Sequence, residues 1–288
     1  MKAAEQIVTS PSSTVRVQPD ATRRLSLSTA LAAHWPEYAI EATLIALFMI
    51  SASIFGVLLE HPASPIHSAI ESPFIRRLLM GCVMGLTAIS LIYSPIGKRS
   101  GAHYNPSVTL TFFRLGKVSA HDAFFYVAAQ IIGGIIGVFV AAVAFRGALA
   151  DPAVHYVTTV PGPAGSTQAF LSELAISFVL MSTVLAFVSR PKLSRFAGLA
   201  AGTLVALFIT FEAPLSGMSM NFARTFGSAA LAQVWTSLWI YFLAPLLGML
   251  AAGEVHIRLH RAIQHCAKLH HENSYPCIFC GANGGSLQ

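Results

Sequence analysis

Apolar residues fill six long stretches of this chain, and short polar segments separate them. The stretches run over residues 38–59, 77–96, 121–145, 168–189, 196–213 and 233–253. Each is close to the roughly 20 residues that an α-helix needs to cross a bilayer. Two further apolar runs, 106–115 and 222–232, are too short to cross. The pattern predicts an all-α membrane protein with six spanning helices and two re-entrant half-helices, which membranes tolerate only where they line a cavity.

Each short run follows a Ser-Gly-x-x-x-Asn segment, at residues 100–105 and 216–221. Asn is a preferred N-cap residue, and Pro106 takes the first helical position, where its missing N–H costs nothing. Each segment therefore predicts an irregular loop that leads into the N-terminus of a half-helix. We call the residues at these junctions the first box (Asn105, Pro106 and Ser107) and the second box (Asn221, Phe222 and Ala223).

An internal repeat relates the two halves of the chain. Glu41 and Glu173 stand near the starts of corresponding apolar stretches, and the two boxes correspond to each other. The pattern Tyr-x-x-Ala-Gln-x-x-Gly from Tyr126 matches Tyr-x-x-Ala-Pro-x-x-Gly from Tyr241. Each half therefore contains three spans and one half-helix. Because three is an odd number of crossings, the two halves must have opposite orientations in the membrane. Such an inverted repeat predicts a functional site near the midplane.

The composition agrees with a membrane protein, because 55% of the residues are hydrophobic and only 10% are charged. Soluble domains carry about 25% charged residues. The net charge of +6 needs no nucleic acid partner, since cytoplasmic loops collect Lys and Arg. If the N-terminus lies in the cytoplasm, the Lys and Arg residues on the outer side of the membrane are only Arg76, Arg77 and Arg146. We therefore expect both termini in the cytoplasm and the chain in a plasma (cell inner) membrane.

The paired boxes resemble the Asn-Pro-Ala boxes of the aquaporin (major intrinsic protein) family. The flanks 101–103 and 225–227 are also similar to the family, and the resemblance covers roughly residues 37–254. The sequence departs from the family at Ser107, where Ala is usual, and at Phe222, where Pro is usual. The resemblance implies an aquaporin-like bundle, a homotetramer in which each subunit has its own pore, and passage of water and small neutral solutes through the membrane lipid. We expect no cofactor and no enzymatic activity, because the spans hold no nucleophile–base pair.

Two half-helices that meet N-terminus to N-terminus would each place roughly half a positive charge at the junction, which repels cations and protons. The side-chain amides of Asn105 and Asn221 can donate hydrogen bonds to a passing neutral molecule. Backbone carbonyls of the loops are expected to line the pore as acceptors, at Gly101, Ala102, His103, Tyr104, Gly217, Ser219 and Met220. In the alternative, the two Asn residues only cap helices in a closed bundle.

Arg224 takes the place of the selectivity-filter Arg of the family. An Arg inside a spanning helix costs about 2.5–3.5 kcal/mol on insertion scales, so it should face the bundle interior or water; the alternative is an Arg that snorkels to the interface. The other filter positions fall on Ile209, Met218 and either Met84 or Gly85. This filter is less polar than a water-selective one, and it favours passage of glycerol- or urea-like solutes as well as water. Thr225 stands where many glycerol facilitators have Asp, which weakens a glycerol-specific interpretation.

Glu41 and Glu173 are expected to brace the boxes by accepting backbone hydrogen bonds, as the resemblance implies. In the alternative they relay protons, as in a secondary transporter built on an inverted repeat. A strictly water-selective channel and a pore blocked by Met218, Met220 or Phe222 are further alternatives.

The chain divides into a disordered tail (1–34), the aquaporin-like channel domain (35–256) and a second cytoplasmic tail (257–288). A transit peptide is the alternative for the first tail. In the second tail, Cys277-x-x-Cys280 has the spacing of one arm of a zinc site, and Cys266 with either neighbouring His could supply the other arm. We expect a reduced tail that binds no metal; the alternative is a zinc site in which His270 is the fourth ligand.

Overall fold

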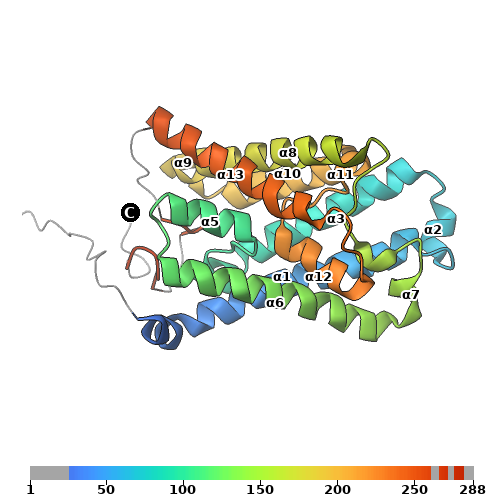
Figure 1. Cartoon of the computed structure of the whole chain (residues 1–288), viewed down its shortest axis with the longest axis horizontal. Helices are drawn as coiled ribbons and strands as arrows, with labels where there is room; N and C mark the ends of the chain where they lie inside the picture. Colours follow the sequence, from blue (N-terminus) through green and yellow to red (C-terminus); the bar gives the residue numbers. More distant parts are fainter. Residues whose placement is uncertain (1–25, 261–265, 272–275, 282–288) are drawn as a thin grey trace, which may run out of the picture.

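The computed structural model describes residues 26–260, 266–271 and 276–281, which form a bundle of long helices running side by side (Figure 1). Among these residues, five helices are long and apolar enough to cross a membrane. They are α1 (Leu27–Glu60), α3 (Pro73–Tyr93), α6 (Ala120–Phe145), α8 (Gly165–Val188) and α13 (Leu238–His260). The predicted all-α membrane fold is therefore confirmed.

The fifth predicted span is shorter than expected. Helix α10 (Ala197–Phe211) has 15 residues, about 22 Å at 1.5 Å per residue. Glu212 separates it from α11 (Ala213–Ser216). Further short helices connect the long ones: α2 (Pro65–Ala69), α4 (Pro95–Ser100), α7 (Gly147–Ala150), the 3-10 turn η1 (His155–Val157) and α9 (Pro191–Ser194).

The two half-helices are α5 (Pro106–Arg114) and α12 (Phe222–Ala232), and they enter the bundle from opposite ends (Figure 1). Each begins at its Asn. The side-chain oxygen of Asn105 accepts from the N–H of Ser107 at 2.9 Å, and that of Asn221 accepts from the N–H of Arg224 at 3.3 Å. N-cap bonds of this kind satisfy donors that a helix start leaves unpaired, so the sequence placed both starts correctly.

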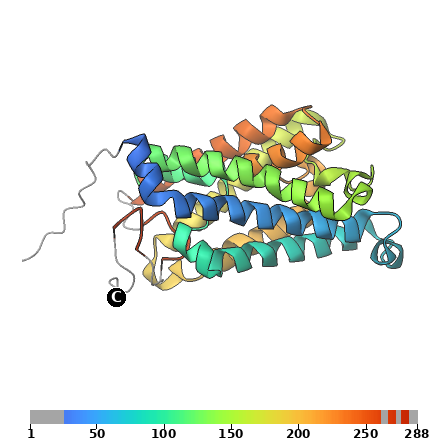
Figure 2. The ribbon, with the colours of Figure 1, turned by 90° about the horizontal axis from the view of Figure 1, so that it is seen from below.

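Glycines in α6 let α1 and α12 approach this helix closely. α6 lies beside α1, which in turn lies beside α3 (Figure 2). A Cβ atom on Gly133 would stand 2.2 Å from the carbonyl oxygen of Ala42 in α1. A Cβ on Gly134 would stand 2.3 Å from that of Ala223 in α12. Small residues at such spacing allow backbones of membrane helices to touch, and here they fix a half-helix against the scaffold.

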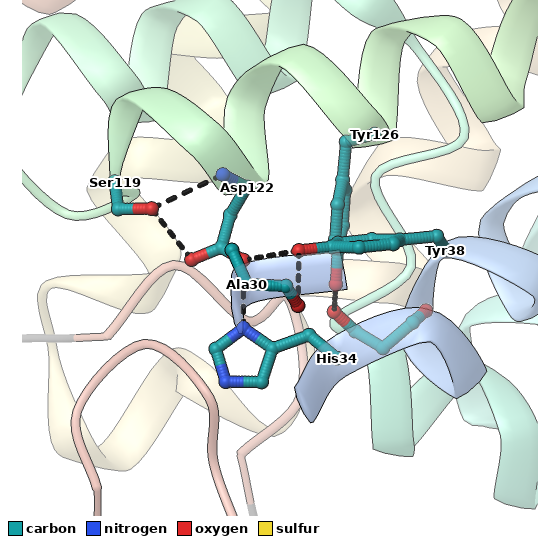
Figure 3. Close-up of polar contacts among 7 residues, drawn as sticks. Ala30, His34, Tyr38, Ser119, Asp122 and Tyr126 are labelled. Atoms are coloured by element: carbon teal, nitrogen blue, oxygen red, sulfur yellow. Dashed lines mark hydrogen bonds and ion pairs between the residues drawn. The ribbon is translucent and has the colours of Figure 1, made fainter. Parts of the chain in front are cut away.

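The N-terminus of α1 differs from the sequence prediction. The helix begins at Leu27, so residues 27–34 are helical and do not belong to a disordered tail; residues 1–25 lie outside the described part. The physical reason is a polar cluster around Asp122 in the first turn of α6 (Figure 3). Asp122 Oδ1 lies 2.7 Å from both His34 Nδ1 and the Tyr38 hydroxyl. These side-chain bonds hold the early turns of α1 against α6.

The C-terminal boundary also moves, because α13 continues to His260 without a break at the predicted border at residue 257. The start of α1 and the end of α13 lie at the same end of the bundle (Figure 1). This arrangement is what an even number of membrane crossings produces.

Candidate pore

The loop before the first half-helix, which we call the first loop (101–104), is held by a buried glutamate. Oε1 of Glu41 accepts hydrogen bonds from the Ser100 hydroxyl at 2.7 Å and from the N–H of His103 at 3.1 Å. Oε2 accepts from the N–H of Tyr104 at 2.6 Å and from Gln130 Nε2 at 2.7 Å. Glu41 has no exposed surface, so these donors replace the water that a carboxylate would otherwise bind.

The second loop (217–220) is held in the same way by Glu173, which is also fully buried. Its Oε1 accepts from the Ser216 hydroxyl at 2.8 Å and the N–H of Ser219 at 2.6 Å. Its Oε2 accepts from the N–H of Met220 at 2.7 Å. The repeat seen in the sequence therefore extends to individual hydrogen bonds.

Both loops use the left-handed region of backbone space at matching positions. The positive φ values are 101°, 55° and 31° at Gly101, Ala102 and Tyr104, and 80°, 51° and 52° at Gly217, Met218 and Met220. Positive φ is uncommon for residues other than glycine, and such residues gather at functional sites where the surroundings hold them in place. Here the surroundings are the glutamate hydrogen bonds, which sequence reasoning anticipated without the backbone geometry.

The two boxes meet in the middle of the bundle through their Asn side chains. Nδ2 of Asn105 donates to the carbonyl oxygen of Met220 at 2.8 Å. Nδ2 of Asn221 donates to the carbonyl oxygen of Tyr104, also at 2.8 Å. Each amide thus caps its own half-helix and also ties it to the loop of the other. Two of the predicted pore carbonyls already accept these hydrogen bonds.

A cavity of about 280 Å³ passes along this junction, with mostly apolar walls. It contacts most of the predicted site residues, namely Met84, Ala102, His103, Tyr104, Asn105, Ile209, Gly217, Met218, Ser219, Met220, Asn221 and Arg224. One cavity thus adjoins both boxes and the proposed filter.

One predicted filter residue and one predicted carbonyl residue do not line the cavity. Gly85 is not part of the cavity wall; it faces α10, where a Cβ would stand 2.6 Å from the carbonyl oxygen of Gly202. Of the two filter alternatives, the structure therefore places Met84 at the cavity. Gly101 also lies outside the wall, and its carbonyl oxygen accepts a hydrogen bond from the N–H of Leu269 at 3.1 Å.

The remaining box residues stand behind the two Asn side chains and do not touch the cavity: Pro106, Ser107, Phe222 and Ala223. The ring of Phe222 packs against Phe226 and Phe242, with centroids 5.5 and 5.0 Å away. Phe222 therefore does not block the pore, and that alternative is wrong for this side chain.

Arg224 lies in the first turn of α12, and its guanidinium donates to the hydroxyl of Thr159. Thr159 comes from the segment before α8 and also lies 3.1 Å from the hydroxyl of Thr225. Sequence reasoning missed Thr159, because a threonine in a loop carries no signal of its own. The contact directs the Arg224 side chain along the cavity wall instead of toward lipid.

Three other residues line the cavity but were not predicted from the sequence. Glu60 and Arg77 lie at the end of the cavity near α2, where they add charge to an apolar wall. Their position beside the loop 60–76 was the available signal. Leu269 lies at the other end and comes from the C-terminal tail.

The tail residues 266–271 and 276–281 lie against the bundle, and four of their side chains gather. The ligand atoms of Cys266, His271, Cys277 and Cys280 all lie within 4.8 Å of one another. Of the two neighbouring histidines that the sequence left open, His271 lies with the cysteines, whereas the ring of His270 packs on Tyr93 at 5.3 Å; the set named with His270 is therefore corrected to His271. The hydrogen bond with Cys266 lowers the pKa of the Cys277 thiol below its usual range, although burial opposes this change.

Comparisons with known proteins agree with this arrangement. Residues 35–256 match the protein family described as Major intrinsic protein. Aquaporin NIP2-1 of Zea mays is 37% identical over 194 residues, 66% of this chain and 63% of the relative. A probable aquaporin NIP-type of Nicotiana alata is 34% identical over 173 residues, 60% of this chain and 62% of the relative.

A solved structure is also similar. The X-ray structure of the aquaglyceroporin from Plasmodium falciparum superposes with a TM-score of 0.62, over 77% of this chain and 95% of that chain, at 18% identity. At this identity the likeness concerns the fold. The chain spans less than two thirds of the length of both plant relatives.

Proposed function

Since this chain belongs to the major intrinsic protein family, an integral membrane family with several spans, we propose that it forms a passive channel. The permeants are water and small neutral solutes of glycerol or urea size, and protons and ions are excluded. One observation carries the proposal: two Asn amides, at the facing N-termini of two half-helices, line a single cavity.

The amides have the right donors for neutral molecules. An amide group carries two N–H bonds, and the hydrogen bonds described above use one at Asn105 and one at Asn221. The second N–H of each is available to a permeating oxygen atom. Because both half-helix N-termini contribute positive partial charge at the same place, a cation meets repulsion there and a neutral molecule does not.

The filter side chains support passage of molecules with an apolar edge. Met84, Ile209, Met218 and Arg224 share the cavity wall, and only Arg224 offers strong hydrogen-bond donors. A solute with both a hydroxyl or amide group and a carbon skeleton can therefore match donor and apolar wall at once. The carbonyls of Ala102, His103, Gly217 and Ser219 would act as the acceptors along the path.

The glutamates support bracing over proton relay. Each carboxylate already accepts hydrogen bonds on both oxygens from its own loop, and neither Glu41 nor Glu173 touches the cavity. A relay needs a carboxylate that can exchange protons with the permeation path. The arrangement therefore favours a passive channel over a proton-coupled transporter.

Assembly and location follow the same proposal. We place the chain in the plasma membrane, with both termini in the cytoplasm, as a homotetramer with four separate pores. Apolar side chains such as Ile132, Ile136 and Phe139 face outward from α6, where lipid or a neighbouring subunit can cover them. Cross-linking in native membranes, followed by mass analysis, tests the tetramer.

Stopped-flow measurements on proteoliposomes test the channel. We expect water, glycerol and urea fluxes that are linear in the solute gradient and well above those of protein-free vesicles. A proton gradient of either sign should leave these fluxes unchanged. Flux that follows the proton gradient would instead assign the protein to proton-coupled transporters, and water flux without any solute flux would make the channel strictly water-selective.

A further inference from the structure

The C-terminal tail covers one end of the cavity. The N–H of Leu269 donates to the carbonyl oxygen of Gly101 at 3.1 Å, and Nε2 of His103 donates to that of Ala267 at 2.6 Å. The ring of Phe279 stacks on His103 with an interplanar angle of 6° and centroids 5.6 Å apart. The first loop is thus bonded to the tail on the side where α13 ends.

Leu269 makes this contact relevant to permeation. Its side chain is 6% exposed and forms part of the wall of the cavity that contains both Asn amides. A buried leucine at the end of a water path offers no hydrogen bond to a permeant, and hydrophobic constrictions of this kind gate channels by excluding water.

Four potential metal ligands lie close together in this tail. In a tetrahedral zinc site with sulfur ligands about 2.3 Å from the ion, ligand atoms are about 3.8 Å apart. The sulfur atoms of Cys266 and Cys277 are 3.1 Å apart, and His271 Nε2 lies 3.2 Å from the sulfur of Cys280. With all four atoms within 4.8 Å of one another, one ion can reach every ligand after small side-chain adjustments.

A buried lysine gives an independent indication of negative charge at this place. Lys268 is 2% exposed, and its Nζ has no hydrogen-bond partner among the described residues. Burying a charged ammonium group is costly unless an opposite charge lies nearby. Three thiolates around a Zn²⁺ ion carry a net charge of −1, which would compensate Lys268.

We propose that Cys266, His271, Cys277 and Cys280 bind one zinc ion, and that this ion fixes Leu269 as a plug in the cytoplasmic mouth of the pore. Loss of the ion releases the tail from the first loop and opens the channel. This gate rests on the proposed channel function, whereas the metal site does not.

The test uses the full-length chain in proteoliposomes, either loaded with zinc or reconstituted with a membrane-permeant chelator. Elemental mass spectrometry gives the zinc content, thiol labelling counts free cysteines, and stopped-flow gives water and glycerol permeability. The double variant Cys277→Ser, Cys280→Ser removes two ligands. Leu269→Ala removes the plug and keeps all ligands. Cys82→Ser is the matched control, since this exposed cysteine lies on α3 outside the cluster.

We expect one zinc ion per chain in the wild type, in Leu269→Ala and in Cys82→Ser, and none in the double variant. Chelation should raise permeability severalfold in the wild type and in Cys82→Ser. The double variant and Leu269→Ala should be permeable with or without zinc.

Two results would overturn the metal site. The first is a wild-type chain that contains no zinc after loading. The second is a loss of free thiols to a disulfide, with permeability that responds to a reductant and not to the chelator. The gate alone would be overturned if the wild type binds one zinc ion per chain but the permeability is the same in every variant and condition. If zinc binds but no preparation conducts more than protein-free vesicles, the channel function fails together with the gate, and the metal site stands.

Discussion

Replacing Glu173 tests whether the buried glutamates hold the pore loops. The carboxylate accepts three hydrogen bonds, from Ser216, Ser219 and Met220, at 2.6–2.8 Å. Glu173→Ala removes both acceptor oxygens and leaves two backbone N–H groups and one hydroxyl without this partner at a fully buried position. Glu173→Gln keeps the size of the side chain, but its NH₂ group then faces a backbone N–H, donor against donor.

The magnitude follows from the number of bonds. Hydrogen bonds to charged groups contribute about 1.5–3 kcal/mol each. Glu173→Gln loses about one such bond, so we expect a destabilisation of roughly 1.5–3 kcal/mol. Glu173→Ala loses three, with an upper limit of roughly 4.5–9 kcal/mol if the contributions add. Because the second loop carries Met218 and Met220 on the cavity wall, both variants should also lose selectivity before the bundle unfolds.

The assay combines thermal unfolding in detergent with solute and proton permeability in proteoliposomes. Glu71→Ala is the matched control, because this glutamate is exposed in the loop between α2 and α3. The bracing argument is refuted if Glu173→Ala unfolds at the wild-type temperature and conducts like the wild type. A Glu173→Gln variant that is as stable as the wild type but loses a proton-driven flux would support the relay alternative.

Three further substitutions give separate tests. Arg224→Ala should remove a fixed charge from the cavity wall and increase leakage of larger solutes or ions; unchanged permeability to all of them would place Arg224 outside the pore. Ile209→His adds a hydrogen-bond donor that contributes roughly 0.5–1.5 kcal/mol to the binding of a water molecule. It also narrows the pore and removes apolar wall, so the glycerol-to-water permeability ratio should fall at equal protein density. A wild-type ratio already near zero would contradict the solute proposal. Asp122→Ala removes the carboxylate that binds His34, Tyr38 and Ser119, so it should lower the free energy of unfolding by at least the about 1.5–3 kcal/mol of one hydrogen bond to a charged group. An unchanged unfolding temperature would show that the cluster at the start of α1 is not stabilising.

The sequence alone determined the fold class and the central features of the site. Apolar runs of about 20 residues predict spanning helices, because the bilayer sets that length. Runs of about ten residues that begin at Asn105 and Asn221 predict half-helices, because capping acts within a few residues. The repeat of Glu41 and Glu173 predicted the symmetric arrangement of the two loops. These are local or periodic properties, which a chain carries in its order of residues.

The tertiary structure decided the features that depend on distant partners. Whether residues 27–34 are helical depends on Asp122, more than 80 positions along the chain. Whether the carbonyl of Gly101 can serve a permeant depends on Leu269, and the choice of His271 over His270 depends on how the tail packs on Tyr93. No periodicity links such residues, since their contacts are created only when the helices pack. The tail therefore joins the pore in the folded chain, although the sequence lists it as a separate segment.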